Sequence, residues 1–280
     1  MIISVINHTN GQISDEEVQR TIRAINKQIT SDYEPYWSLG ATLRLEGRST
    51  ATPDAGDRPA DMRGDAVLYL WSDSDVPGAL GYHDENHNGI PFGFVFTQLS
   101  AQIGENWTVT LSHEALELIA DPEVNLLVQG PHPADPNKIV FFWYEMCDAV
   151  QAETYEVDGI EVSNFLLPLY FTASDELGGR NDFLGRAYSG QTLRSFGINP
   201  GGYVGFFNPE TGEHETVSLQ GDEQAQARLN AKAKYKAARR VIRYLGTPLS
   251  EKMRKDHKAP QAPLCDRGIT VLQRRRLPSK

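Results

Sequence analysis

Three ionisable side chains precede Asp121 in the apolar segment 107–122 (WTVTLSHEALELIADP): His113, Glu114 and Glu117. Residues four apart on a helix share one face and lie about 6 Å apart along the axis, so His113 and Glu117 would lie one above the other. The other positions are apolar almost all the way round, which is typical of a buried helix. Because a buried carboxylate needs a compensating charge, the segment predicts a buried helix that binds a divalent metal ion.

The spacing is that of H-E-x-x-H, in which two histidines bind zinc and the glutamate between them is the general base. Here the motif reads H-E-A-L-E, so Glu117 places a carboxylate at the second ligand position. Carboxylate oxygen is an accepted zinc ligand, at about 2.0–2.2 Å. One histidine with two carboxylates is a harder and more anionic ligand set, which also suits manganese or iron. The predicted cofactor is therefore Zn²⁺, with Mn²⁺ or Fe²⁺ as alternatives.

A second interpretation of the same segment is an ordinary solvated helix. H-E-x-x-E arises easily by chance, and the polar positions would then form a stripe that faces water. The residues of that stripe would be Thr110, His113, Glu114, Glu117 and Asp121. This interpretation predicts an exposed polar face and no metal site.

Asp121 follows Glu117 by four residues and His113 by eight. Eight residues of helix span about 12 Å, too far for Asp121 and His113 to bind one ion. We interpret Asp121-Pro122 as the end of the helix followed by a new N-cap with proline at N1. Asp121 is instead assigned to the carboxylates that hydrogen-bond the ligand residues without binding the ion themselves.

The segment Ile139 to Asp148 (IVFFWYEMCD) resembles the thermolysin-like peptidases, or gluzincins. In that family a glutamate some two dozen residues beyond the second ligand completes the zinc site. An aspartate about one helical turn later hydrogen-bonds the first histidine. Glu145 lies 28 residues beyond the second ligand position, and Asp148 three further. The resemblance covers residues 107–148 and implies Glu145 as third ligand and Asp148 as the carboxylate that orients His113.

The resemblance implies a metal-dependent peptidase that uses metal-activated water, with Glu114 as general base and a peptide or protein as substrate. Such enzymes stabilise the tetrahedral oxyanion with a Tyr or His hydrogen bond. The sequence does not distinguish between Tyr155, Tyr170, Tyr203 and His214, and Tyr203 is taken as the working candidate. The alternative is a catalytically inactive zincin-like binding module that acts through its basic C-terminal extension.

The segments before the motif predict an α/β arrangement. Residues 2–7, 41–45 and 66–71 read as strands, and 49–63 as a polar loop. Ser14 and Glu17 form a capping box that begins a helix with an apolar stripe at 18, 22, 25 and 29. This strand–helix–strand–strand order is what the N-terminal sheet of a zincin domain would show. The predicted fold is α+β, a zincin-like domain over residues 1–221 with a mixed N-terminal sheet and a buried active-site helix.

Three further patterns predict local structure. Gly89 to Phe96 is expected to be the edge strand that lines the substrate cleft. His83 to Gly89 contains D-x-N-x-N-G, the first half of an EF-hand loop, but Val95 occupies the twelfth position. We interpret it as a polar turn, with calcium binding or a histidine near the cleft as the alternative. Asp158-Gly159 predicts a hairpin, and residues 201–212 a strand with its turn.

Charge divides the chain into two parts. Residues 222–280 hold 16 Lys or Arg and 5 Asp or Glu, a balance of +11, whereas residues 1–221 carry −21. A long basic helix is expected at 222–245, followed by a mostly extended tail. This extension predicts an acidic protein partner or a nucleic acid, or docking on the acidic body of its own chain.

Composition sets the class of protein. The chain is 40% hydrophobic and 23% charged, as in ordinary globular proteins. It has neither a signal-peptide pattern at its start nor a run of about eighteen apolar residues, so we expect a cytoplasmic protein without a membrane partner. Cys147 and Cys265 are too few for a disulfide framework, and Cys147 is interpreted as a packed residue.

The charge asymmetry predicts that a 1–221 chain folds and binds metal without the extension. Contacts that depend on the +11 segment should be lost with it, and in the full chain they should weaken steeply with salt, since exposed charges are screened within about 10 Å at 0.1 M. Solubility, cooperative unfolding and bound metal of the 1–221 chain are the measurements. An insoluble or non-cooperative 1–221 chain would show that the 222–245 helix packs into the core.

Overall fold

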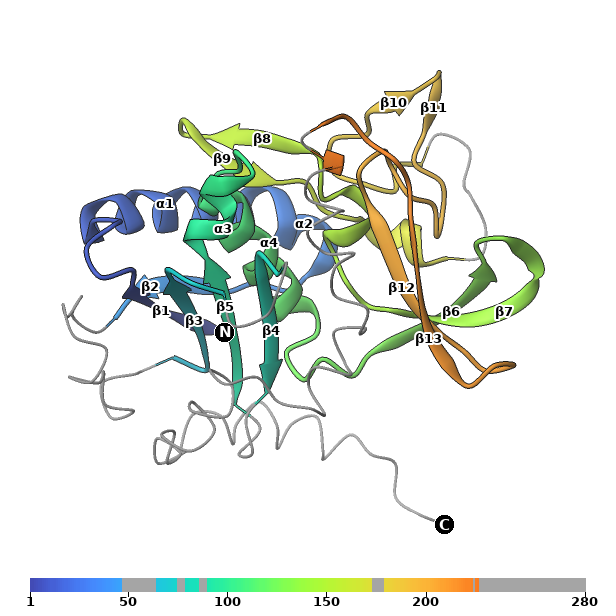
Figure 1. Cartoon of the computed structure of the whole chain (residues 1–280), viewed down its shortest axis with the longest axis horizontal. Helices are drawn as coiled ribbons and strands as arrows, with labels where there is room; N and C mark the ends of the chain where they lie inside the picture. Colours follow the sequence, from blue (N-terminus) through green and yellow to red (C-terminus); the bar gives the residue numbers. More distant parts are fainter. Residues whose placement is uncertain (47–63, 75–78, 86–89, 173–178, 224, 227–280) are drawn as a thin grey trace, which may run out of the picture.

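The computed structural model describes residues 1–46, 64–74, 79–85, 90–172, 179–223, 225 and 226. It is a mixed α+β structure in which two larger sheets flank a central helix (Figure 1). The helices are α1 (Asp15–Gln28), α2 (Glu34–Trp37), α3 (Thr97–Gln102) and α4 (Trp107–Ala120), with a π-helical turn η1 (Ile29–Tyr33) and 3-10 turns η4 (Asp148–Val150) and η5 (Pro168–Phe171). Among the described residues, no helix is both long and apolar enough to cross a membrane.

The first sheet has the strand order β2-β1-β3-β5-β4. Its strands are β1 (Ile2–His8), β2 (Thr42–Leu45), β3 (Ala66–Trp71), β4 (Gly81–Glu85) and β5 (Pro91–Phe96). The pairs β1–β2, β1–β3 and β3–β5 are parallel, whereas β4 runs antiparallel to β5 at the edge. The predicted strands of the N-terminal part and their mixed sheet are thus confirmed.

The prediction that Gly89–Phe96 forms the edge strand is wrong. Pro91–Phe96 is β5, which lies between β3 and β4, and all six of its residues are buried. A continuous apolar run is typical of a strand covered on both faces, and this signal should have favoured an internal position. The edge strands are β2 and β4, and β4 contains His83 to Glu85, which the sequence led us to interpret as part of a turn.

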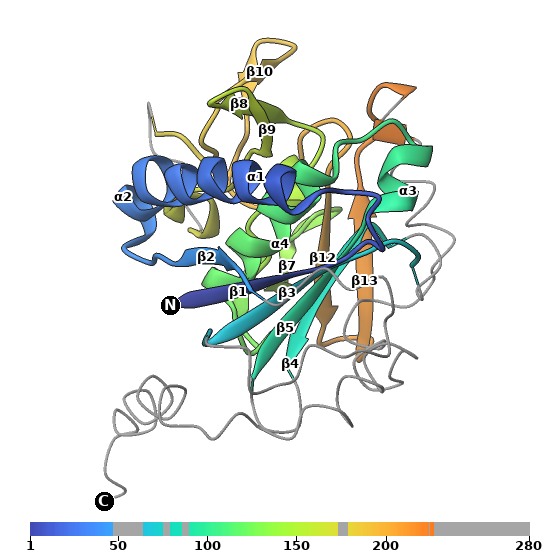
Figure 2. The same cartoon turned by 90° about the vertical axis from the view of Figure 1, so that its left-hand side faces the viewer.

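Helices α1 and α4 cover one face of this sheet (Figure 2). α1 begins where predicted: the backbone N–H of Glu17 donates to Ser14 Oγ at 3.2 Å, which satisfies one of the amides that a helix start leaves unpaired. The predicted apolar stripe of α1 is buried against the sheet at Val18, Ile22 and Ile25. The opposite face of the sheet carries a separate, largely aromatic cluster, with Tyr69, Tyr82, Phe92, Phe94 and Phe96 among its members.

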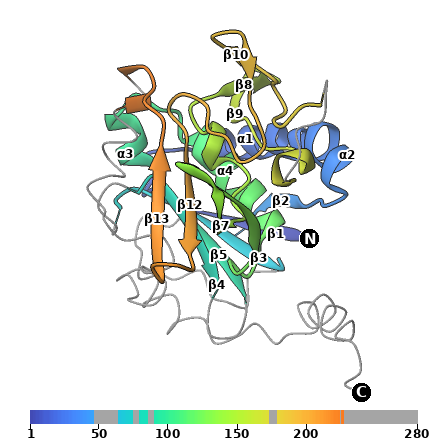
Figure 3. The same cartoon turned by 90° about the vertical axis from the view of Figure 1, so that its right-hand side faces the viewer.

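The second sheet has the order β13-β12-β7-β6 and is antiparallel throughout (Figure 3). Its strands are β6 (Leu127–His132), β7 (Asp135–Trp143), β12 (Tyr203–Asn208) and β13 (Glu213–Ser218). Two hairpins complete the structure, β8 (Thr154–Val157) with β9 (Ile160–Ser163), and β10 (Ala187–Tyr188) with β11 (Gln191–Thr192).

The predicted turn at Asp158-Gly159 is confirmed. It joins β8 and β9 with positive φ at both residues, 51° and 76°, as a type I′ turn requires. The strand and turn predicted at 201–212 are also confirmed, as β12 and its connection to β13.

Several predicted segments lie partly or wholly outside the described residues. His83 to Glu85 belong to β4 rather than to a polar turn, because Tyr82 and its neighbours pair with β5. The remainder of that segment, the polar loop at 49–63 and nearly all of the 222–280 extension lie outside the described residues. Ala225, at the start of the extension, is buried. Its Cβ lies 2.5 Å from the position that a Cβ on Gly201 would occupy. The first turn of the extension therefore packs on the body.

Replacing Ser14 with Ala should lower the free energy of unfolding by about 1 kcal/mol, the usual loss for an N-cap hydroxyl. Urea unfolding of the full chain is the measurement. Ser218→Ala, at an exposed end of β13, is the control and should change stability little. Equal stability of Ser14→Ala and the unaltered chain would show that the cap does not hold α1.

Candidate metal centre

α4 is buried from Val109 to its end. It packs against β4 and β5 on one side and against β9 on another. His113 is 7% exposed, Glu114 1% and Glu117 0%. The interpretation of this segment as a solvated stripe is therefore wrong, because the ionisable side chains point into the protein rather than into water.

His113 meets two carboxylates at one ring nitrogen. Its Nε2 lies 3.1 Å from Glu117 Oε1 and 3.3 Å from Asp148 Oδ1. Among the described residues Nε2 nevertheless has no hydrogen-bond partner, so these approaches lack hydrogen-bond geometry. Ligand atoms around one tetrahedral zinc ion lie ~3.4 Å apart when each bond is about 2.0–2.1 Å. The spacing of the three atoms fits ligands arranged around an ion.

The segment between β7 and η4 brings the other acidic groups. Glu117, Glu145 and Asp148 each place a ligand atom within 4.8 Å of the others. The backbone N–H of Cys147 donates to Glu117 Oε1 at 3.2 Å, which fastens this segment to α4. Glu117 thus lies beside both of the other residues expected to bind metal, His113 and Glu145, and Asp148 approaches His113 as well.

Asp148 was expected to orient His113 from behind the ligands. Its Oδ1 approaches the same nitrogen that Glu117 approaches, whereas a supporting carboxylate binds the ring nitrogen remote from the metal. This placement makes Asp148 a candidate ligand alongside Glu145.

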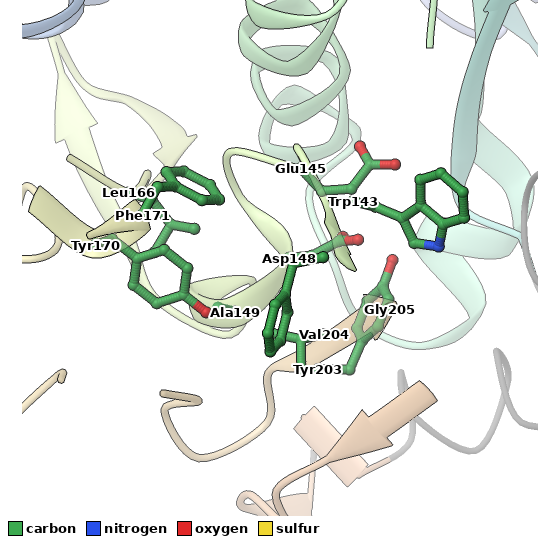
Figure 4. A pocket seen from close by; sticks show the side chains of 11 residues that line it. Trp143, Glu145, Asp148, Ala149, Leu166, Tyr170, Phe171, Tyr203, Val204 and Gly205 are labelled. Atoms are coloured by element: carbon green, nitrogen blue, oxygen red, sulfur yellow. The ribbon is translucent and has the colours of Figure 1, made fainter. Parts of the chain in front are cut away.

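A small hollow opens beside these carboxylates (Figure 4). Aromatic side chains make up much of its wall, and Glu145 and Asp148 lie on one side of it. Tyr203 lines the same hollow, and Figure 4 shows its hydroxyl directed toward the two carboxylates.

The other three oxyanion candidates are placed less favourably. Tyr155 donates its hydroxyl to Asp32 at 2.9 Å, and Tyr170 donates to the carbonyl of Gly197 at 2.8 Å. His214 is exposed on β13, where its ring packs against Trp143. Tyr170 also lines the hollow, so Tyr203 differs from it in the direction of its hydroxyl.

Asp121 ends α4 as predicted, but no helix begins after it. Its two carboxylate oxygens accept the backbone N–H groups of Asn125 and Leu126 at 3.0 and 2.9 Å. These bonds shape the turn that leads into β6 and explain why the chain does not start a second helix there.

His83 is a site residue that the sequence offered only as the alternative to a polar turn. It lies on β4 with a side chain 2% exposed, and its Nδ1 is 3.3 Å from Glu114 Oε2. The D-x-N-x-N-G pattern that begins at Asp84 suggested a turn and hid the strand. A usable signal was the alternation of His83 with Tyr82, since neighbouring residues of a strand face opposite sides.

The carboxylates control the ionisation of both histidines. Burial lowers the pKa of His113, but the negative charge of Glu117 and the nearness of Asp148 outweigh it and raise the pKa to about 10. For His83, burial is likewise outweighed by Glu114, Glu145 and Glu117, and its pKa rises to about 9. Burial and the charge of Glu117 raise the pKa of the Cys147 thiol, so it remains neutral.

No protein-family model, curated protein sequence or solved structure matches this chain. A function for this chain is therefore proposed from the geometry of the site alone.

Without metal, the free energy of unfolding should fall as the pH rises from about 6.5. The contribution of His83 is lost by about pH 9 and that of His113 by about pH 10. In that range the folded chain keeps protons on His83 and His113 that the unfolded chain, with a histidine pKa of about 6.5, has released. Each such proton lowers the free energy of unfolding by at most about 1.4 kcal/mol per pH unit. Below pH 6.5 the contribution is fully present.

Urea unfolding of chelator-treated protein between pH 6 and 9.5 measures this slope. His113→Gln should flatten it, whereas His132→Gln, which lies outside the site, should not. A slope that His113→Gln leaves unchanged would contradict the protonation assigned to His113.

Proposed function

We propose that this protein is a metal-dependent peptidase with a zincin-like fold. The observation that carries the proposal is the cluster around Glu117, whose carboxylate lies beside His113, beside Glu145 and Asp148, and beside the buried Glu114. The first sheet supports the zincin-like assignment, since it is mixed, has an antiparallel edge strand, and lies against the helix that carries the motif.

The residues present suit a divalent cation. His113 would hold it through Nε2, with Glu117 as second ligand and Glu145 and Asp148 as the acidic ligands from the following segment. Imidazole and carboxylate donors suit zinc, and the excess of oxygen donors also suits manganese or iron. Such a cation supplies Lewis acidity, which lowers the pKa of water and polarises a carbonyl.

Glu114 is the group proposed to move the proton. Its carboxylate lies within 4.8 Å of a Glu117 oxygen, so it lies next to the cation site. It accepts a proton from the attacking water and passes it to the leaving amine. A Cβ at position 81 would lie only 2.7 Å from Glu114 Oε1, so Gly81 leaves the room that this carboxylate needs.

Tyr203 is proposed to stabilise the oxyanion. It enters the hollow from β12, and Glu145 and Asp148 line the same hollow. A phenol at this position donates a hydrogen bond to the oxygen that becomes negative when water attacks. The walls of the hollow are largely aromatic, and surroundings of low polarity strengthen such an interaction.

Replacing Glu114 with Gln should leave the fold and the ion bound by His113 intact. It should lower the rate of peptide hydrolysis by about 10²–10⁴-fold, the usual contribution of a general base. His113→Ala should remove the ion that His113 would bind. Glu156→Gln, an exposed carboxylate on β8, is the matched control and should change neither.

The measurements are elemental analysis of protein purified without chelator and mass-spectrometric detection of cleavage in a peptide library. Absence of metal after adding zinc or manganese would overturn the proposal. So would equal cleavage by Glu114→Gln and the unaltered chain. Metal binding without cleavage would favour the inactive binding module that acts through the basic extension.

A further inference from the structure

A second group of ligand atoms lies on the β4 side of Glu117. His83, Glu114 and Glu117 each offer one such atom, and all three lie within 4.8 Å of one another. His83 Nδ1 is 3.3 Å from Glu114 Oε2 and 3.9 Å from Glu117 Oε2. Ligands bonded to one ion at about 2.0–2.2 Å are separated by ~3–4.4 Å, so these distances fit a common ion.

Glu117 faces both groups with different oxygens. Its Oε1 lies toward His113, and its Oε2 lies toward His83. A carboxylate in this position can bind one ion with each oxygen. Together the two groups contain two histidines and four carboxylates, from His83, His113, Glu114, Glu117, Glu145 and Asp148. The same composition builds the carboxylate-bridged two-metal centres of helical bundles.

The backbone of the sheet leaves space for this second group. Gly81 and His83 alternate along β4 and therefore face the same side, toward α4. A Cβ on Gly81 would collide with Glu114, and a Cβ on Gly93 of the paired strand would lie 3.2 Å from the Cβ of His83. The absence of side chains at both positions makes room for an imidazole and a carboxylate inside a packed layer.

Burial adds a further argument. The His83 side chain is 2% exposed, that of Glu114 1% and that of Glu117 0%. The other ring nitrogen of His83, Nε2, has no hydrogen-bond partner among the described residues. Nδ1 is the ring nitrogen that faces the two carboxylates, so an ion would bind there, and Nε2 would carry the proton of the neutral ring.

We propose that the protein binds a second divalent transition-metal ion through His83 Nδ1, Glu114 and Glu117, with Glu117 as the bridge to the first ion. The proposal rests on the metal centre of the proposed function, to which it adds a site. Occupation of the second site ties Glu114 to a cation. Glu114 is therefore available as a general base only in chains that hold one ion.

The test is a titration of the full chain, freed of metal by chelator and dialysis, with Mn²⁺ and separately with Zn²⁺. Calorimetry and elemental analysis should give two ions per chain. Electron paramagnetic resonance of the Mn²⁺ form should show a coupled pair. His83→Phe, which keeps the ring volume, should retain one ion and give an uncoupled manganese signal.

His132→Phe is the matched control, since His132 lies beside Glu215 away from the site, and it should bind two ions. Circular dichroism reports whether each variant folds. If His83→Phe does not fold, Glu114→Gln takes its place and should weaken the second ion at least tenfold. One ion per chain, or two ions without coupling, would overturn the second site and leave the proposed function intact. No bound ion would overturn both.

Discussion

The carboxylate of Glu117 is completely buried, so its negative charge must be compensated by the groups packed around α4. One oxygen accepts the backbone N–H of Cys147 and faces His113, and the other faces His83. A charge in this position would destabilise the fold unless polar groups from several elements met it. The first sheet, the segment after β7 and α4 itself each supply one such group, so three parts of the chain meet at this single side chain.

The same constraint explains the apolar surroundings. Leu111, Leu116 and Leu118 fill the core around the ionisable face of α4 and keep water from it. In such surroundings each charge interacts more strongly with its neighbours than it would at the surface. Protons and metal ions then compete for the same nitrogens, because a ligating imidazole must be neutral. The low polarity of the core thus strengthens the attraction between these carboxylates and a proton or cation placed among them.

Local signals in the sequence predicted much of this structure. The capping box at Ser14, the turn at Asp158-Gly159 and the helix that carries His113 all depend on short-range chemistry, and all three are found. The position of β5 was mistaken because strand order depends on pairing between distant residues, which a single segment does not record. For the same reason the sequence favoured a polar turn at His83 over a place in the site: the partners of His83 lie on another element, 31 and 34 residues away.

The order of the elements along the chain has a consequence for synthesis. β4, β5, α3 and α4 follow one another without interruption by any other helix or strand of the described chain, so His83, Glu114 and Glu117 belong to one continuous stretch. Asp148 comes 31 residues after Glu117. The ribosome synthesises the chain from the N-terminus onward, so the residues around His83 emerge first. The group around His113 is complete only after Asp148 has emerged. A nascent chain thus passes through a stage in which the carboxylates of α4 have emerged before the segment that fastens to them.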